Sequence, residues 1–93
     1  SASKTHINLT FLSLVMSHYE LDARRLLCPL PVIRTEQRVA QLAAGDTLDI
    51  VCTDPGALYD IPAWCRMHGH AIIATKQNPS GELRVTVRVG ARP

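Results

Sequence analysis

Cys28 is the residue whose type and position best suit chemistry, because it stands in the run Cys28-Pro29-Leu30-Pro31 at the predicted start of a helix. The thiolate is the nucleophilic form of cysteine, so reactivity depends on pKa and access. Free amide groups and the positive end of the helix dipole stabilise an anion at this place. The position therefore predicts a thiol with a stabilised anion that can exchange sulfur with other thiols. The alternative is that Cys28 only fills space at a helix end.

Four charged residues could act beside this thiol. Arg24 and Arg25 lie just upstream, and either they are solvated charges or they add positive potential and recognise a partner or an anion. Asp54 and Asp60 follow the next predicted strand. The simplest interpretation makes them turn and cap residues, and the alternative is that they orient a loop facing Cys28.

The two other cysteines are expected to pack in the core. Cys52 ends an apolar run, and Cys65 lies within a predicted helix, where a secondary thiol role is the alternative. Neither forms a Cys-x-x-Cys pair with Cys28, so a thioredoxin-like dithiol is not predicted. Cys65, His68 and His70 are too few ligands for a structural zinc site, and we expect no bound metal.

Length and composition predict one small domain. The chain has 93 residues, of which 46% are hydrophobic and 19% charged, and this balance is typical of a compact domain. The formal net charge is only +2, and its basic residues are scattered rather than gathered in a stripe. Charge therefore gives little reason to expect direct nucleic-acid binding.

Residues 1–16 are expected to be an N-terminal extension, disordered or non-native, before a domain at 17–93. The apolar stretch 7–16 is shorter than the roughly 20 residues that a membrane-spanning helix needs. It also lacks the clean cleavage site of a signal peptide. The run Met16-Ser17-His18 is instead typical of a natural start.

Two helices are predicted from apolar periodicity and from their end residues. Apolar positions at spacings of three and four indicate an amphipathic helix over about 29–43, ended by Gly45. The second helix is placed with Asp60 as its N-cap, because Pro62 is best tolerated in a first turn, and Gly69 ends it. Residues 55–59, just before the second helix, are expected to form a turn or a short 3₁₀ segment.

Four short strands complete the predicted fold. Apolar residues alternate strictly in the last strand, which indicates one buried and one wet face, whereas the third strand has the composition of a buried strand. The order is β-α-β-α-β-β, and we predict an α/β (α+β) two-layer sandwich with a mixed four-stranded sheet and both helices on one face. The predicted strands are 19–22, 47–52, 70–75 and 83–89.

Two ordered runs resemble the signatures of the TusA/SirA-like sulfur carrier family. The first is 21–32, Leu-Asp-Ala-Arg-Arg-Leu-Leu-Cys-Pro-Leu-Pro-Val, which contains the family's Cys-Pro-x-Pro core. The second is Asp54-Pro55 followed by 60–65, Asp-Ile-Pro-Ala-Trp-Cys, and 45–48 between them also has the familiar form. The resemblance covers about residues 19–89. One departure is Arg25, which stands where the family usually has glycine, so the loop before Cys28 is expected to be rearranged.

The resemblance implies a sulfur carrier. Cys28 would accept sulfane sulfur as a persulfide, from a cysteine desulfurase or rhodanese-type donor, and pass it to a thiol acceptor protein. Uses in the family include 2-thiouridine synthesis in tRNA, sulfur oxidation and cofactor assembly. No cofactor is implied beyond the covalent sulfur. The implied supporting residues are Asp22, Arg24, Pro29 and Pro31, and the possible partner surface comprises Arg25, Asp54 and Asp60.

The leading hypothesis is therefore a cytoplasmic persulfide carrier of the sulfurtransferase type. It would act only with protein partners and would not associate with a membrane. The residues do not decide whether such a carrier counts as an enzyme. Two other functions fit the same pattern: a non-catalytic RNA-binding or regulatory module of this fold, and a thiol redox sensor that oxidises at Cys28.

Overall fold

The computed structural model describes residues 17–91, so the expected N-terminal extension lies outside the described residues. Within 17–91, no helix combines the length and the apolar composition needed to cross a membrane. The predicted order β-α-β-α-β-β is confirmed. The elements are β1 (His18–Ala23), α2 (Leu30–Val39), β2 (Thr47–Cys52), α3 (Ala57–His68), β3 (Ala71–Gln77) and β4 (Leu83–Arg88).

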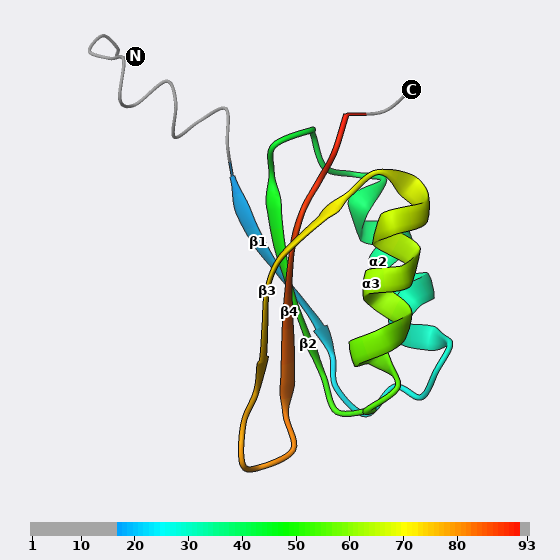
Figure 1. The fold of residues 1–93 in the computed structure, drawn as a ribbon, viewed down its shortest axis with the longest axis vertical. Helices are drawn as coiled ribbons and strands as arrows, with labels where there is room; N and C mark the ends of the chain where they lie inside the picture. Colours follow the sequence, from blue (N-terminus) through cyan, green and yellow to red (C-terminus); the bar gives the residue numbers. More distant parts are fainter. Residues whose placement is uncertain (1–16, 92–93) are drawn as a thin grey trace, which may run out of the picture.

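The four strands form one mixed sheet in the order β1-β2-β4-β3. β1 pairs with β2 in parallel, whereas β4 pairs antiparallel with both β2 and β3. Both helices pack on the same face of the sheet (Figure 1). The predicted two-layer sandwich is therefore confirmed, and β1 and β3 are its edge strands.

The core lies between the sheet and the two helices, as the alternation in the last strand predicted. Leu83, Val85 and Val87 of β4 are buried, whereas the residues between them face the other side. Cys52 and Cys65 have no exposed surface, so their predicted burial is confirmed. The other core side chains are Ala23, Val39, Leu42, Leu48, Ile50, Ala57, Ile61 and Val89.

The first helix is shorter than the predicted 29–43, because it ends at Val39 and a tight turn follows. The buried Asp46 stabilises this turn, since its carboxylate accepts a hydrogen bond from the Ala43 amide at 2.9 Å. Gly45 lies within the turn and does not end the helix. The apolar spacing in the sequence continues past the helix end because Leu42, in the turn, is also buried in the core.

The second helix begins earlier than predicted, so the placement of Asp60 as its N-cap is wrong. α3 starts at Ala57, and Pro62 lies inside it. The turn 54–56 leads directly into the helix, because the Ala57 amide donates to the Asp54 carbonyl at 3.0 Å. Pro62 is thus accommodated at the cost of one backbone hydrogen bond. Gly69 ends the helix in a left-handed conformation, as predicted.

The third strand is not buried, although its composition suggested burial. β3 forms a sheet edge, and Ile73 is 48% exposed. Ile72 packs against the core, but an irregularity in the pairing with β4 follows it. An edge strand has one partner strand, so apolar residues in it can remain accessible.

Candidate functional site

Cys28 lies in the loop between β1 and α2, at the end of the sheet where the parallel strands β1 and β2 finish. β1 and β2 run in register from His18 opposite Thr47 to Ala23 opposite Cys52. The loops that follow these strands therefore meet at one end of the molecule (Figure 1). Cys28 is partly exposed there, one residue before the N-cap of α2.

Asp54 joins the two loops. One of its carboxylate oxygens accepts a hydrogen bond from the Cys28 amide at 2.7 Å, and the other accepts one from the Gly56 amide at 3.2 Å. The hydrogen bond from the Cys28 thiol, followed by those from the two amides, keeps the pKa of Asp54 below its usual value. The structure thus places Asp54 at the thiol, where it orients the loop that carries Cys28.

The charge around the sulfur is opposite to the sequence-based expectation. The carboxylates of Asp54 and Asp60 accept hydrogen bonds from the thiol and raise the pKa of Cys28 to about 12. The prediction of a stabilised anion is therefore wrong for the free protein. Two carboxylates near the sulfur outweigh the helix dipole, whose effect is modest at an exposed site. At neutral pH the Cys28 thiol is protonated.

Gly56 lacks a side chain, and the Cys28 sulfur lies beside it. A methyl group at this position would lie 3.1 Å from Cys28 Sγ, closer than ordinary contact. The backbone of Gly56 is right-handed helical, so glycine is not needed for its conformation. Its small size instead keeps the β2–α3 loop close to the thiol.

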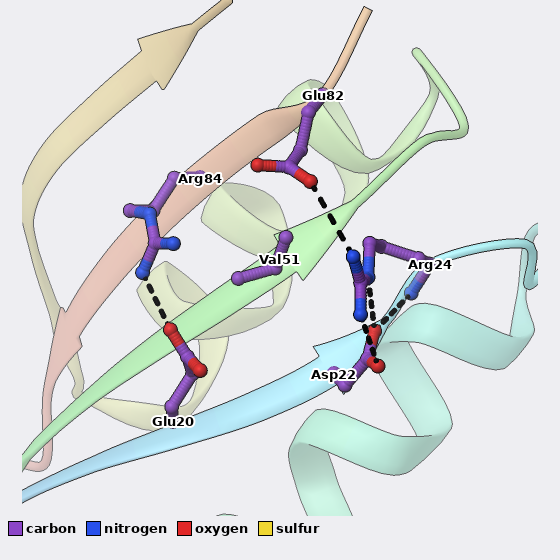
Figure 2. A pocket seen from close by; sticks show the side chains of 6 residues that line it. All are labelled: Glu20, Asp22, Arg24, Val51, Glu82 and Arg84. Carbon is purple, nitrogen blue, oxygen red and sulfur yellow. Dashed lines mark hydrogen bonds and ion pairs between the residues drawn. The ribbon is translucent and has the colours of Figure 1, made fainter.

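Arg24 is directed toward the sheet rather than toward the thiol. Its guanidinium donates to both carboxylate oxygens of Asp22 at 2.9 Å and lies 3.8 Å from Glu82 (Figure 2). This bidentate pairing keeps the pKa of Asp22 well below its usual range. The motif residues Asp22 and Arg24 therefore stabilise the start of the loop before Cys28.

The uncovered face of the sheet carries a polar pocket that sequence reasoning missed. It has a volume of about 170 Å³ above Val51 (Figure 2). Arg84 bridges Glu20 at 2.8 Å and Asp49 at 3.1 Å on one side of it. The polar alternation of the last strand could have indicated this face, but not its partners. The lining residues are Glu20, Asp22, Arg24, Val51, Glu82 and Arg84.

Arg25 takes the backbone conformation that glycine favours. Its φ is +68°, and its amide donates to Thr53 Oγ1 at 2.8 Å. Arginine thus adopts the left-handed conformation here, so the prediction that its presence rearranges the loop to avoid that conformation is wrong. A cavity of about 470 Å³ adjoins it, lined by Asp22, Arg24, Arg25 and Thr53.

Exposed apolar side chains flank Cys28, and sequence reasoning did not single them out. Leu27 is 72% exposed, and Leu30 and Ile33 are also exposed. Their signal in the sequence was the run of leucines on both sides of the cysteine. As for metals, residues 17–91 contain no cluster of three or more His, Cys, Asp or Glu side chains placed to hold an ion.

Trp64, expected in the core, packs partly against it and partly beside two histidines. The indole ring stacks on His70 with centroids 5.1 Å apart and lies 4.9 Å from the His68 ring. Cys65, next to it in α3, faces the core instead. The structure thus separates these histidines from the buried thiol.

Comparison with known proteins places these features in one family. The sequence profile described as "Sulfurtransferase TusA" matches residues 19–89. Each of the three relatives described next bears the name "putative sulfur carrier protein". YrkI of Bacillus subtilis is 36% identical over 68% of this chain and 81% of its own length. A protein of Neisseria meningitidis serogroup A is 41% identical over 62% of this chain and 78% of its own length.

YrkF of Bacillus subtilis is also 41% identical, over 60% of this chain, but the match spans only 30% of YrkF. Among solved structures, a SirA-like protein from Desulfitobacterium hafniense has the same fold. The TM-score is 0.70 at 20% identity, with 77% of this chain and 97% of that protein covered. Because the family profile spans nearly all of residues 17–91, the chain belongs to the TusA sulfurtransferase family.

Proposed function

We propose that this protein carries sulfur as a persulfide on Cys28, taking it from a donor protein and passing it to an acceptor protein. The observation that carries the proposal is the exposure of the three cysteines. Cys52 and Cys65 are fully buried, whereas Cys28 is accessible at the end of the sheet. Family membership supports sulfur as the cargo.

The transfer balances without an external oxidant. The Cys28 sulfur attacks the terminal sulfur of a persulfide on the donor, which forms a new S–S bond and breaks the donor's S–S bond. The donor's cysteine leaves as a thiolate and takes up the proton that Cys28 gives away. Attack by an acceptor thiolate on the Cys28 persulfide repeats this exchange in the next step.

The raised pKa of Cys28 supports a dependence on partners. A thiol with a pKa of about 12 is almost entirely protonated at neutral pH and attacks slowly. A docked partner that draws Asp54 or Asp60 away from the sulfur would lower that pKa. We therefore infer that loading requires a specific donor, such as a cysteine desulfurase or a rhodanese-type enzyme.

Three unpaired cysteines suit a reducing compartment, and we place the protein in the cytoplasm. The proposed destinations of the sulfur are 2-thiouridine synthesis in tRNA and other sulfur metabolism. On this proposal the protein meets its partners directly and needs no resident cofactor.

Sulfur loading of purified protein tests the proposal. The protein is incubated with a cysteine desulfurase and cysteine, and its intact mass is measured without reductant. We expect the wild type and Cys52→Ala to gain the mass of one sulfur atom and Cys28→Ala to gain none. An adduct on Cys28→Ala, or none on the wild type, would contradict the proposal.

The alternative functions receive less support from the site. Peroxide sensing needs a thiolate, and the carboxylates beside Cys28 disfavour that form. RNA binding needs unpaired basic residues, but Arg24 and Arg84 on the uncovered sheet face are paired with carboxylates. Peroxide treatment followed by mass measurement separates a sensor from a carrier.

A further inference from the structure

Arg25 is the one residue other than glycine with a positive φ among residues 17–91. This conformation is unfavourable for a residue with a Cβ, and it is kept only where the surrounding structure requires it. Such outliers gather at functional sites, so the side chain placed there merits a physical explanation.

Hydrogen bonds at Arg25 and just after it hold the backbone of this loop. Its own amide donates to Thr53 Oγ1 at 2.8 Å, and three residues later the Cys28 amide donates to Asp54 at 2.7 Å. The loop before Cys28 is thus fastened to the β2–α3 loop at two points. Neither contact uses the Arg25 side chain, so the fold does not need a guanidinium here.

The Arg25 side chain is exposed and, among the described residues, makes no hydrogen bond or ion pair. Its neighbour Arg24 differs, because Asp22 and Glu82 already pair with it. Asp22 also lines the cavity beside Arg25, but its carboxylate is engaged by Arg24. Arg25 acts on Asp22 only through space, so among the described residues no carboxylate contacts its guanidinium, and its positive charge stands open next to Cys28.

The residues around Arg25 indicate which kind of partner surface its charge would bind. Exposed Leu27 and Leu30 flank Cys28, and the carboxylates of Asp54 and Asp60 lie near its sulfur. These two carboxylates would repel an acidic partner at the sulfur, whereas the Arg25 guanidinium beside them would attract it. We propose that Arg25 binds a carboxylate of the sulfur-donor protein, with the leucines against an apolar part of the same surface. This inference rests on the proposed function.

Loading kinetics of Arg25 variants test the proposal. Arg25→Ala and Arg25→Gly remove the charge, Arg25→Lys keeps it, and Arg88→Ala removes a similar exposed charge at the opposite end of β4. With a cysteine desulfurase as donor, we expect Arg25→Ala and Arg25→Gly to load roughly three- to five-fold more slowly. Arg25→Lys should recover most of the rate, and Arg88→Ala should match the wild type. The difference should shrink at high salt.

Two further measurements separate partner binding from loop structure. Arg25→Gly should be more stable than Arg25→Ala, because glycine takes the left-handed conformation without strain. Alkylation of Cys28 by iodoacetamide, which needs no partner, should proceed equally in the wild type and Arg25→Ala. Equal loading of the wild type and Arg25→Ala would overturn this inference alone. No loading of the wild type would overturn the proposed function and this inference with it.

Discussion

At the scale of single residues, the proton on Cys28 is the central feature of the site. The carboxylates of Asp54 and Asp60 hold it there and raise the pKa of Cys28 to about 12. A protonated thiol reacts slowly with oxidants and unrelated disulfides. The two carboxylates that slow the reactions of the thiol therefore also protect it from oxidation while no partner is bound.

Removing one carboxylate should free the thiol. In Asp60→Asn we expect the pKa of Cys28 to fall below about 12, because a neutral amide neither repels the thiolate nor accepts the thiol hydrogen as strongly. Iodoacetamide alkylation followed by mass against pH measures this, and Glu36→Gln is a control carboxylate on α2. Asp54→Asn should lower the pKa further, but it also weakens the contacts to the Cys28 and Gly56 amides. An unchanged alkylation profile in both variants would contradict this account.

At the scale of elements, the end of β4 is fastened to the junction between α3 and β3. The Gly90 amide donates to His70 Nδ1 at 2.9 Å, directly after the left-handed Gly69 that ends α3. The backbones are so close that a Cβ on Gly90 would overlap the Gly69 carbonyl oxygen. This contact closes the sheet end opposite Cys28.

A methyl group should disrupt this junction. We expect Gly90→Ala to lower the free energy of unfolding by about 2–3 kcal/mol, because backbone atoms must move apart. Gly69→Ala meets no neighbouring atom and should cost about 1 kcal/mol, from the left-handed φ of +78° alone. Urea unfolding of both variants measures the difference. Gly90→Ala as stable as the wild type would show that the junction is not so tight.

At the scale of the whole molecule, the three thiols link stability to alkaline pH. Burial raises the pKa of Cys52 and of Cys65 to about 11, from 9.0 for a free thiol, and carboxylates raise that of Cys28 to about 12. The unfolded chain therefore loses these protons at lower pH than the native state. The resulting stabilisation is complete below about pH 9 and is lost as pH rises through these native pKa values.

Unfolding in urea at several pH values tests this linkage. With reductant present, we expect the free energy of unfolding to fall steadily between about pH 9 and pH 11. Cys65→Ala should be less stable at every pH, because a buried side chain is shortened, but its stability should fall less steeply with pH. Equal slopes in the two proteins would contradict a contribution from Cys65.

Local patterns in the sequence determined most of the architecture. The alternation of β4 reports one buried face, and the spacing of three and four in α2 reports a helix packed on one side. The Cys-Pro-x-Pro run marked Cys28 and, with the second signature, pointed to the family. These features depend on residues close together in the chain, so they can be predicted from the sequence without the tertiary structure.

The tertiary structure alone decided how the Cys28 site works. Cys28 and Asp54 are 26 residues apart, and they meet because β1 and β2 are parallel neighbours whose following loops share one end. The pKa of Cys28 is raised because Asp54 lies beside it, and sequence periodicity does not reveal this contact. The exposure of β3 likewise depends on its place at the sheet edge. The sequence thus identified the thiol and the sulfur carrier family, whereas the packing of distant loops set the protonation of that thiol.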